Sequence, residues 1–338
     1  MNKHFKYSVL ILGYGLALVF ALEISLRVYG IKFLNERQKS YEFDDVLGWT
    51  TRKSFKSWHS SQSSAHFKYY NPDGFPTTKE GFKKPASTTE PTIAFIGDSF
   101  VEGYYIPYEQ TFVKLFDESE PEIQTINLGV SGYSPDQYLL NARKILSNYN
   151  IISIIVVFFP RNDIENVKID HYNNYAKPLF TDKLDSPINI PLKNHFILRD
   201  ETGVKNMLRN SSIYSILRPF IKKYSSKISL KSAINYEKGQ MKNSLRFIKQ
   251  INDEFDVSSF FIYYLPDVNE LQNANSYQNN INNFIDICRG WGINYVIPSN
   301  LIKYKDNKVN LYIPDGHLSS IGSKLVFKDL ISHYKIKK

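Results

Sequence analysis

Residues 92–100 read Thr-Ile-Ala-Phe-Ile-Gly-Asp-Ser-Phe, a short apolar run that stops at Gly97, Asp98 and Ser99. The first five residues are β-branched or apolar without alternation, which is typical of a strand buried on both faces of a parallel sheet. A serine just beyond the carboxyl end of such a strand lies where open α/β sheets bind their ligands. Asp and Ser also favour ordinary turns and helix caps, so this run alone does not make Ser99 a nucleophile.

Strand and helix patterns alternate after this run. Further strands are predicted at residues 123–128, 151–159, 259–265 and 293–297, and helices at residues 108–119, 135–149, 237–255, 277–289 and 320–333. This alternation indicates βαβ units and a parallel sheet. Residues 165–232 interrupt it with basic, aromatic and Asn/Pro-rich sequence that contains one predicted helix, at residues 204–224. We expect this insertion to lie over the carboxyl edge of the sheet as a lid, a substrate platform or a long excursion.

The N-terminal sequence predicts a membrane helix. Residues 7–22 carry no charge and follow Lys3 and Lys6, and the apolar character resumes after Glu23 and Arg27. A cleaved signal peptide is the alternative, because the uncharged run is shorter than a usual spanning helix. No convincing small-x-small cleavage site follows, and Glu23 and Arg27 are spaced to pair on one helix face, so we favour an uncleaved single-pass anchor. Lys3 and Lys6 favour an extracytoplasmic main domain, whereas basic residues beyond the helix argue for the reverse.

The chain therefore divides into three predicted parts. Residues 1–34 form the anchor and its flank, residues 35–90 a lead-in with little regular structure, and residues 91–338 the main α/β domain with its insertion at about 165–232. The formal net charge of +9 comes from scattered Lys and Arg with acids between them, so we expect no nucleic-acid partner. The single cysteine, Cys288, excludes an internal disulfide and a cysteine-based metal site.

A nucleophilic serine needs a base, and His317 is the best candidate among the seven histidines. It follows Pro314-Asp315-Gly316 in a loop before the last predicted helix, so it too lies at an edge of the sheet. Asp315 can accept the second ring N–H of the histidine and fix its tautomer. The other six histidines lie near the termini or in polar sequence where a solvated side chain is expected, and they are His4, His59, His66, His171, His195 and His333.

Two further strand ends offer donors for an oxyanion. Gly132 follows the second predicted strand, and a glycine lets a backbone N–H approach a ligand closely. Asn162 follows the third predicted strand in Pro160-Arg161-Asn162-Asp163 and offers a neutral amide. Each residue alone is typical of an ordinary loop. Their joint occurrence with Ser99 and His317, each at a strand end or before a helix, favours an active site.

With these four blocks the chain resembles the SGNH/GDSL hydrolases over about residues 91–334. The residues that match the Ser, Gly, Asn and His of that family are Ser99, Gly132, Asn162 and His317. The resemblance implies a flavodoxin-like αβα sandwich with about five parallel strands. It also implies a nucleophile at Ser99, an oxyanion hole made by the Ser99 N–H, the Gly132 N–H and the Asn162 amide, and acyl-ester chemistry without a metal or other cofactor.

Two positions depart from the usual family pattern. Asp315 precedes His317 by two residues where three are usual, and Arg161 precedes the asparagine where many members have glycine. Arg161 either binds an anionic substrate group or points into solvent. We predict an esterase that acts on acyl esters, O-acetyl esters of a cell-envelope glycan in particular. An O-acyltransferase for a surface polysaccharide and a catalytically inactive envelope scaffold are the alternatives, and the oligomeric state is left open.

Overall fold

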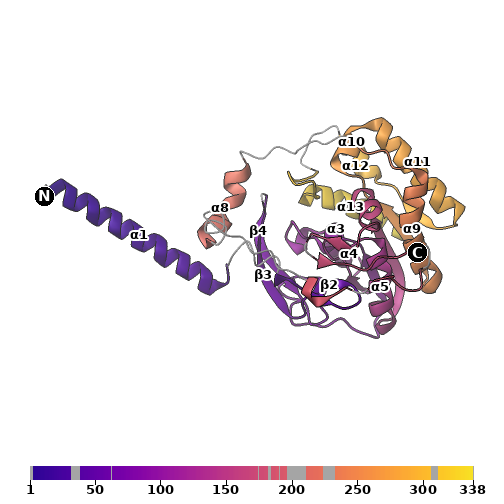
Figure 1. Cartoon of the computed structure of the whole chain (residues 1–338), viewed down its shortest axis with the longest axis horizontal. Coiled ribbons are helices and arrows are strands. Elements are labelled where there is room, and N and C mark those ends of the chain that lie inside the picture. The colour runs from indigo at the N-terminus through magenta and orange to yellow at the C-terminus, as the bar shows by residue number, and fades with distance from the viewer. Residues whose placement is uncertain are drawn as a thin grey trace.

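The computed structural model describes residues 3–31, 39–61, 63–173, 175–181, 184–189, 191–195, 211–223, 233–305 and 311–337. A helix at the N-terminus, α1 (Lys3–Tyr29), extends away from the rest of the chain (Figure 1). The remaining described elements build a central sheet with helices on both faces, together with three small antiparallel sheets.

The central sheet has five parallel strands, and these are β6 (Thr92–Ile96), β7 (Gln124–Asn127), β8 (Ile151–Phe158), β11 (Ser259–Tyr264) and β12 (Asn294–Val296). Their order across the sheet is β7-β6-β8-β11-β12, with every neighbouring pair parallel. Numbered along the chain this order is 2-1-3-4-5, the flavodoxin-like arrangement. The predicted α/β fold is therefore confirmed. The strand order reverses between β6 and β8, so the crevice where such sheets bind ligands lies at the carboxyl ends of these two strands.

Helices cover both faces of the sheet because its strands bury alternate side chains on opposite sides. On β8, Ile154 and Val156 belong to one apolar cluster, and Ile155 and Val157 belong to another. The first cluster is closed by α5 (Pro135–Ile145), α9 (Lys238–Glu254) and α11 (Ala274–Gly290). The second is closed by α4 (Phe112–Ser119), α12 (Ser299–Tyr304) and α13 (Ser320–Lys337). These helices agree with the predicted ones, apart from α12, which the sequence did not predict.

Short elements fill the connections. Those close to the carboxyl edge of the sheet are α3 (Ser99–Glu102), α6 (Pro160–Asn166) and α10 (Val268–Gln272). The others are η1 (Tyr108–Gln110), η2 (Leu146–Asn148), β9 (His171–Tyr172), β10 (Tyr175–Ala176) and η3 (Lys193–His195). In the insertion, the predicted helix corresponds to α8 (Ser212–Lys223), and residues 204–210 of that prediction lie outside the described residues.

The prediction of little regular structure in the lead-in is wrong. Its strands are β1 (Tyr41–Asp44), β2 (Gly48–Thr51), β3 (Phe55–Ser60), β4 (Ala65–Tyr70) and β5 (Pro76–Thr77). β1 and β2 form a hairpin, and β3, β4 and β5 form a three-stranded antiparallel sheet. His59, expected to be solvated, is buried in β3 with its ring against that of Tyr104.

Candidate active site

Ser99 is the first residue of α3, three residues beyond the last residue of β6. Asp98 caps this helix, because its Oδ1 accepts a hydrogen bond of 3.0 Å from the backbone N–H of Phe100. Gly103 ends the helix in a left-handed conformation with φ of +66°. Asp98 thus shapes the turn that presents Ser99, and Ser99 lies at the switch point of the sheet.

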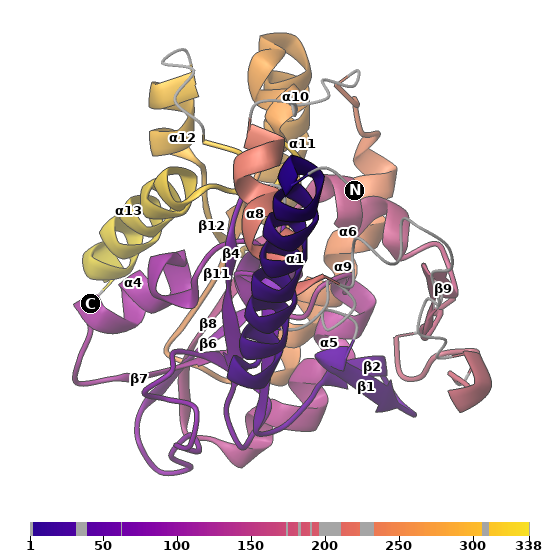
Figure 2. The same cartoon turned by 90° about the vertical axis from the view of Figure 1, so that its left-hand side faces the viewer.

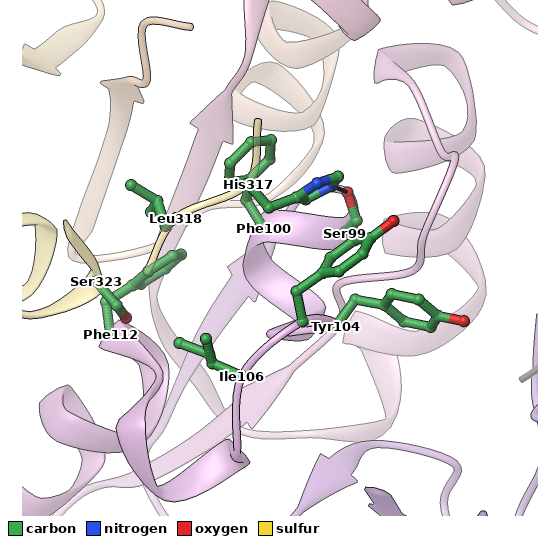
Figure 3. Close-up of a pocket in the computed structure, with 9 residues that line it drawn as sticks. Ser99, Phe100, Tyr104, Ile106, Phe112, His317, Leu318 and Ser323 are labelled. Carbon is green, nitrogen blue, oxygen red and sulfur yellow. Dashed lines mark hydrogen bonds between the residues drawn. The ribbon is translucent and has the colours of Figure 1, made fainter. Parts of the chain in front are cut away.

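His317 faces Ser99 across this edge of the sheet (Figure 3). Its Nε2 lies 2.8 Å from the Ser99 Oγ, and its Nδ1 lies 3.3 Å from Oδ1 of Asp315. With the ring proton on Nδ1, the imidazole donates to Asp315 and accepts from the Ser99 hydroxyl. The three residues therefore have the connectivity of a serine–histidine–aspartate triad.

The loop geometry explains how Asp315 serves His317 from only two residues away. The backbone N–H of His317 donates to Asp315 Oδ1 at 3.2 Å, which closes an Asx-type turn. The same oxygen then faces Nδ1 of the ring. Gly316, with φ of +93°, makes the tight turn between them, and the N–H of Ile313 donates to the His317 carbonyl at 2.7 Å.

Two aromatic rings lie against the imidazole of His317. The Phe100 ring stacks on it at a centroid distance of 4.7 Å, and the Tyr105 ring lies 3.9 Å from it. Contacts of this kind restrict the rotation of the imidazole, so that Nε2 stays directed at Ser99. The sequence analysis did not identify these two residues, although both follow Ser99 closely in the chain.

Asn162 lies in the first turn of α6 rather than in a loop, and Pro160 is the N1 residue that starts this helix. Its Nδ2 donates to Oδ2 of Asp98 at 2.7 Å, which fixes the amide beside the Ser99 turn. A primary amide has two N–H donors, so one remains for a substrate oxygen. Asp163 anchors the start of α6 by accepting from the Phe159 N–H at 2.9 Å. Burial raises the pKa of Asp98 and that of Asp163.

The loop after β7 brings Gly132 to the same edge. A Cβ on Gly129 would lie 2.2 Å from the backbone nitrogen of Glu102, so only glycine allows the loop to pass this close to α3. Gly132 has φ of +86°, and a Cβ there would lie 2.6 Å from the Tyr172 ring. The structure therefore brings Ser99, His317 and Asp315 into direct contact. It also fixes the Asn162 amide on Asp98, beside Ser99, and sets the Gly132 loop against α3.

Glu102 is a further residue of this site that sequence reasoning missed. Its fully buried carboxylate accepts from the N–H of Ser131 at 2.7 Å, one residue before Gly132. Two hydroxyls from the lead-in also donate to it, that of Tyr41 at 2.9 Å and that of Tyr70 at 2.7 Å. Lys68 lies 3.4 Å away and supplies the counter-charge. We call the Glu102 carboxylate and these four donors the Glu102 cluster. The cluster connects α3, the Gly132 loop and the lead-in.

The structure pairs Arg161 with an acid of the protein itself. Its Nη1 donates to Oδ2 of Asp267 at 2.8 Å, and about a quarter of the Arg161 side chain stays exposed. Asp267 also caps α10 through its other oxygen. Binding of an anionic substrate group by Arg161 stays a prediction, and such a group would compete with Asp267.

A small depression adjoins Ser99 and His317. It encloses about 240 Å³ of space open to solvent, and its other walls are mainly apolar, with Ile106, Phe112 and Leu318 among them. In the described part of the chain, no group of three or more His, Cys, Asp or Glu side chains is arranged to hold a metal ion.

Comparison with known proteins gives structural similarities only. No family model matches the chain, and no curated protein matches it in sequence. One similar solved structure is a member of the lipolytic protein G-D-S-L family from Veillonella parvula, with 11% identity over 72% of this chain and 98% of that chain, and a TM-score of 0.40. Another is the psychrotrophic esterase EstA from Pseudoalteromonas sp., with 13% identity, 72% and 96% coverage and a TM-score of 0.40. The acetyl xylan esterase AlAXEase has 13% identity, 72% and 98% coverage and a TM-score of 0.38.

Proposed function

We propose that this protein is a serine-dependent hydrolase of acyl esters of the SGNH/GDSL type, anchored in a membrane by α1. The observation that carries the proposal is the hydrogen bond of 2.8 Å between the Ser99 Oγ and Nε2 of a histidine that also faces Asp315. A hydroxyl placed in this way transfers its proton to the imidazole as the oxygen attacks an ester carbonyl.

The reaction proceeds in two halves. Ser99 attacks the carbonyl carbon, and His317 takes the hydroxyl proton while Asp315 stabilises the imidazolium. The N–H groups of Ser99 and Gly132 and the free N–H of Asn162 receive the oxyanion. His317 then protonates the leaving alcohol, and the acyl group stays on Ser99. Water deprotonated by His317 releases the acid in the second half.

Two features of the site support a short acyl group and water as its acceptor. The apolar depression beside Ser99 is small, which suits an acetyl group better than a long acyl chain. In addition, about a fifth of the His317 side chain and about a quarter of the Asp315 side chain are exposed. Transfer to a sugar hydroxyl requires water to be excluded from the acyl-enzyme. The partial exposure of His317 and Asp315 therefore favours hydrolysis, with O-acetyl esters of a cell-envelope glycan as the proposed substrates.

The proposed attachment to a membrane rests on α1. Its 27 residues span about 40 Å at 1.5 Å per residue, more than the roughly 30 Å of a hydrocarbon core. A signal sequence passes the same test of length and composition. Cleavage near its end would remove Glu23 and Tyr29, and Glu23 binds the first N–H groups of α8 while the Tyr29 ring contacts that of Phe67. These contacts support a retained anchor. The proposed location of the catalytic part outside the cytoplasm rests on Lys3 and Lys6, which precede the helix.

The test compares the full chain in mild detergent with its Ser99→Ala variant. We expect hydrolysis of an aryl acetate and covalent labelling by a fluorophosphonate in the wild type, and neither in Ser99→Ala. Ser332→Ala, which removes an exposed hydroxyl on α13, is the matched control and keeps both activities. Labelling of Ser99→Ala at the wild-type level would show that another residue is the nucleophile. Acetate release with and without an added glycan acceptor distinguishes hydrolysis from transfer.

A further inference from the structure

The outer face of α8 is apolar and exposed, even though α8 is not part of the proposed membrane helix α1. Leu217, Phe220 and Ile221 are 45%, 66% and 52% exposed. At about 100° per residue they fall within about 100° of arc, so they form one stripe along the helix. In the described part of the chain outside α1, the other exposed large apolar residues lie in other segments, and they are Val46, Ile188, Leu192, Ile297 and Ile321.

The opposite face of α8 is polar and packs on the protein. Ser212 and Ser215 are fully buried, and the indole N–H of Trp58 donates to Oγ of Ser215 at 2.6 Å. Pro219 has no N–H for the carbonyl of Ser215, and the hydroxyl of Ser60 donates to that carbonyl at 2.6 Å instead. The helix thus binds β3 with small polar residues and directs large apolar residues outward, the reverse of the usual pattern for a surface helix.

α8 also lies beside the C-terminal part of α1, as both views show (Figures 1 and 2). The carboxylate of Glu23 accepts from the backbone N–H groups of Ser212 and Ile213 at 2.8 and 3.1 Å, and from the Ser211 hydroxyl at 3.0 Å. Glu23 is the first charged residue after the uncharged residues 7–22. The N-terminus of α8 therefore lies beside Glu23, at the level where the uncharged run of α1 ends.

We propose that α8 is a membrane-interface helix whose stripe of Leu217, Phe220 and Ile221 inserts into the leaflet from which α1 emerges. The inference rests on the proposed anchorage of α1. Lipid is selected as the occupant because α8 starts beside the point where the uncharged run of α1 ends, next to the exposed apolar surface of the anchor. A helix of this kind lies about 5–10 Å deep at the boundary of headgroups and acyl chains. The protein then contacts the bilayer through both α1 and α8, and the second contact fixes how the catalytic part is oriented on the bilayer.

The test uses single cysteines that carry an environment-sensitive fluorophore, in the full chain reconstituted into phosphatidylcholine vesicles. Burial raises the pKa of the native Cys288 thiol to about 12, so the wild-type chain is the unlabelled background. Phe220→Cys probes α8, and Leu12→Cys probes the middle of α1. Asp286→Cys is the matched control, because the Asp286 side chain is 58% exposed. Its helix, α11, lies on the side of the protein away from α1 (Figure 1).

We expect a nitroxide lipid labelled near the headgroup to quench most of the fluorescence at position 220 and little of it at position 286. A nitroxide at the bilayer centre should quench position 12 most strongly. If position 12 is quenched and position 220 behaves like position 286, α1 is an anchor and the proposal for α8 is wrong. A blue-shifted signal at position 220 that no nitroxide lipid quenches indicates a second copy of the chain on α8, which also overturns it. Absence of quenching at position 12 refutes the anchorage itself and the α8 proposal with it.

Discussion

The Glu102 cluster offers a quantitative test of how the lead-in supports the active site. The Glu102 and Lys68 side chains are almost completely buried, with charged groups 3.4 Å apart. Removing one partner of a buried ion pair costs about 3–5 kcal/mol, because the remaining charge is left without compensation. Glu102→Gln keeps the shape of the side chain and one acceptor oxygen for the N–H of Ser131. Its main effect is therefore to leave the buried ammonium group of Lys68 without a counter-charge. At roughly 2 °C per kcal/mol for a chain of this size, the melting temperature should fall by about 6–10 °C.

A double-mutant cycle isolates the ion pair from the hydrogen bonds. Lys68→Met removes the charge and keeps an apolar stem of similar length, and the carboxylate then still has the donors Tyr41, Tyr70 and the Ser131 N–H. The double variant should lose less stability than the two single variants together, with an interaction energy of about 1–3 kcal/mol. The measurement is thermal unfolding in mild detergent followed by tryptophan fluorescence. Strict additivity, or an unchanged melting temperature in Glu102→Gln, would refute the reasoning.

Three further changes test other parts of the structure. Asn162→Ala removes one oxyanion donor and should lower kcat on an aryl acetate roughly a hundredfold to a thousandfold, whereas an effect on KM alone would exclude this role. Gly132→Ala introduces a Cβ 2.6 Å from the Tyr172 ring at a φ of +86° and should destabilise the fold by about 1–3 kcal/mol, and Tyr172→Ala in the same chain should recover part of the loss in a thermal melt. Burial raises the pKa of Glu270 from 4.5 to about 8, so the folded state holds this proton more tightly and stability is lost as pH rises through that range. Glu270→Gln should therefore melt several degrees above the wild type at pH 9 and at nearly the same temperature at pH 4, and equal melting temperatures at both pH values would contradict the assignment.

The central strands, and the site residues that follow them, could be predicted because their local sequence pattern reflects their place in the fold. The apolar runs of β6 and β8 are buried on both faces, so composition alone identifies them as central strands. Ser99 and Asn162 follow these two strands directly, and the order of the sheet then brings them to one switch point. The predicted contact between His317 and Asp315 depends only on a local turn, and the structure shows it.

Elements stabilised by distant partners were not predicted. The hydroxyls of Tyr41 and Tyr70 reach a carboxylate 61 and 32 residues away, and no local pattern encodes such a contact. The strands of the lead-in are short and mix aromatic with charged residues, so their pairing depends on contacts beyond the local sequence. A helix at α6 could have been predicted, because Pro160 after an apolar strand is a common N1 residue.

The predicted boundary at residue 91 separates groups that the structure joins. A chain beginning there would lack Tyr41, Lys68 and Tyr70 and would leave the Glu102 carboxylate with only the Ser131 N–H of its present partners. Water would have to replace the lost donors and the counter-charge, which would draw α3 toward solvent. Such a shift moves the helix that begins with Ser99 and the loop that carries Gly132. We infer that the unit able to hold the active site begins at or before Tyr41, so that the lead-in and the α/β sheet fold as one catalytic domain.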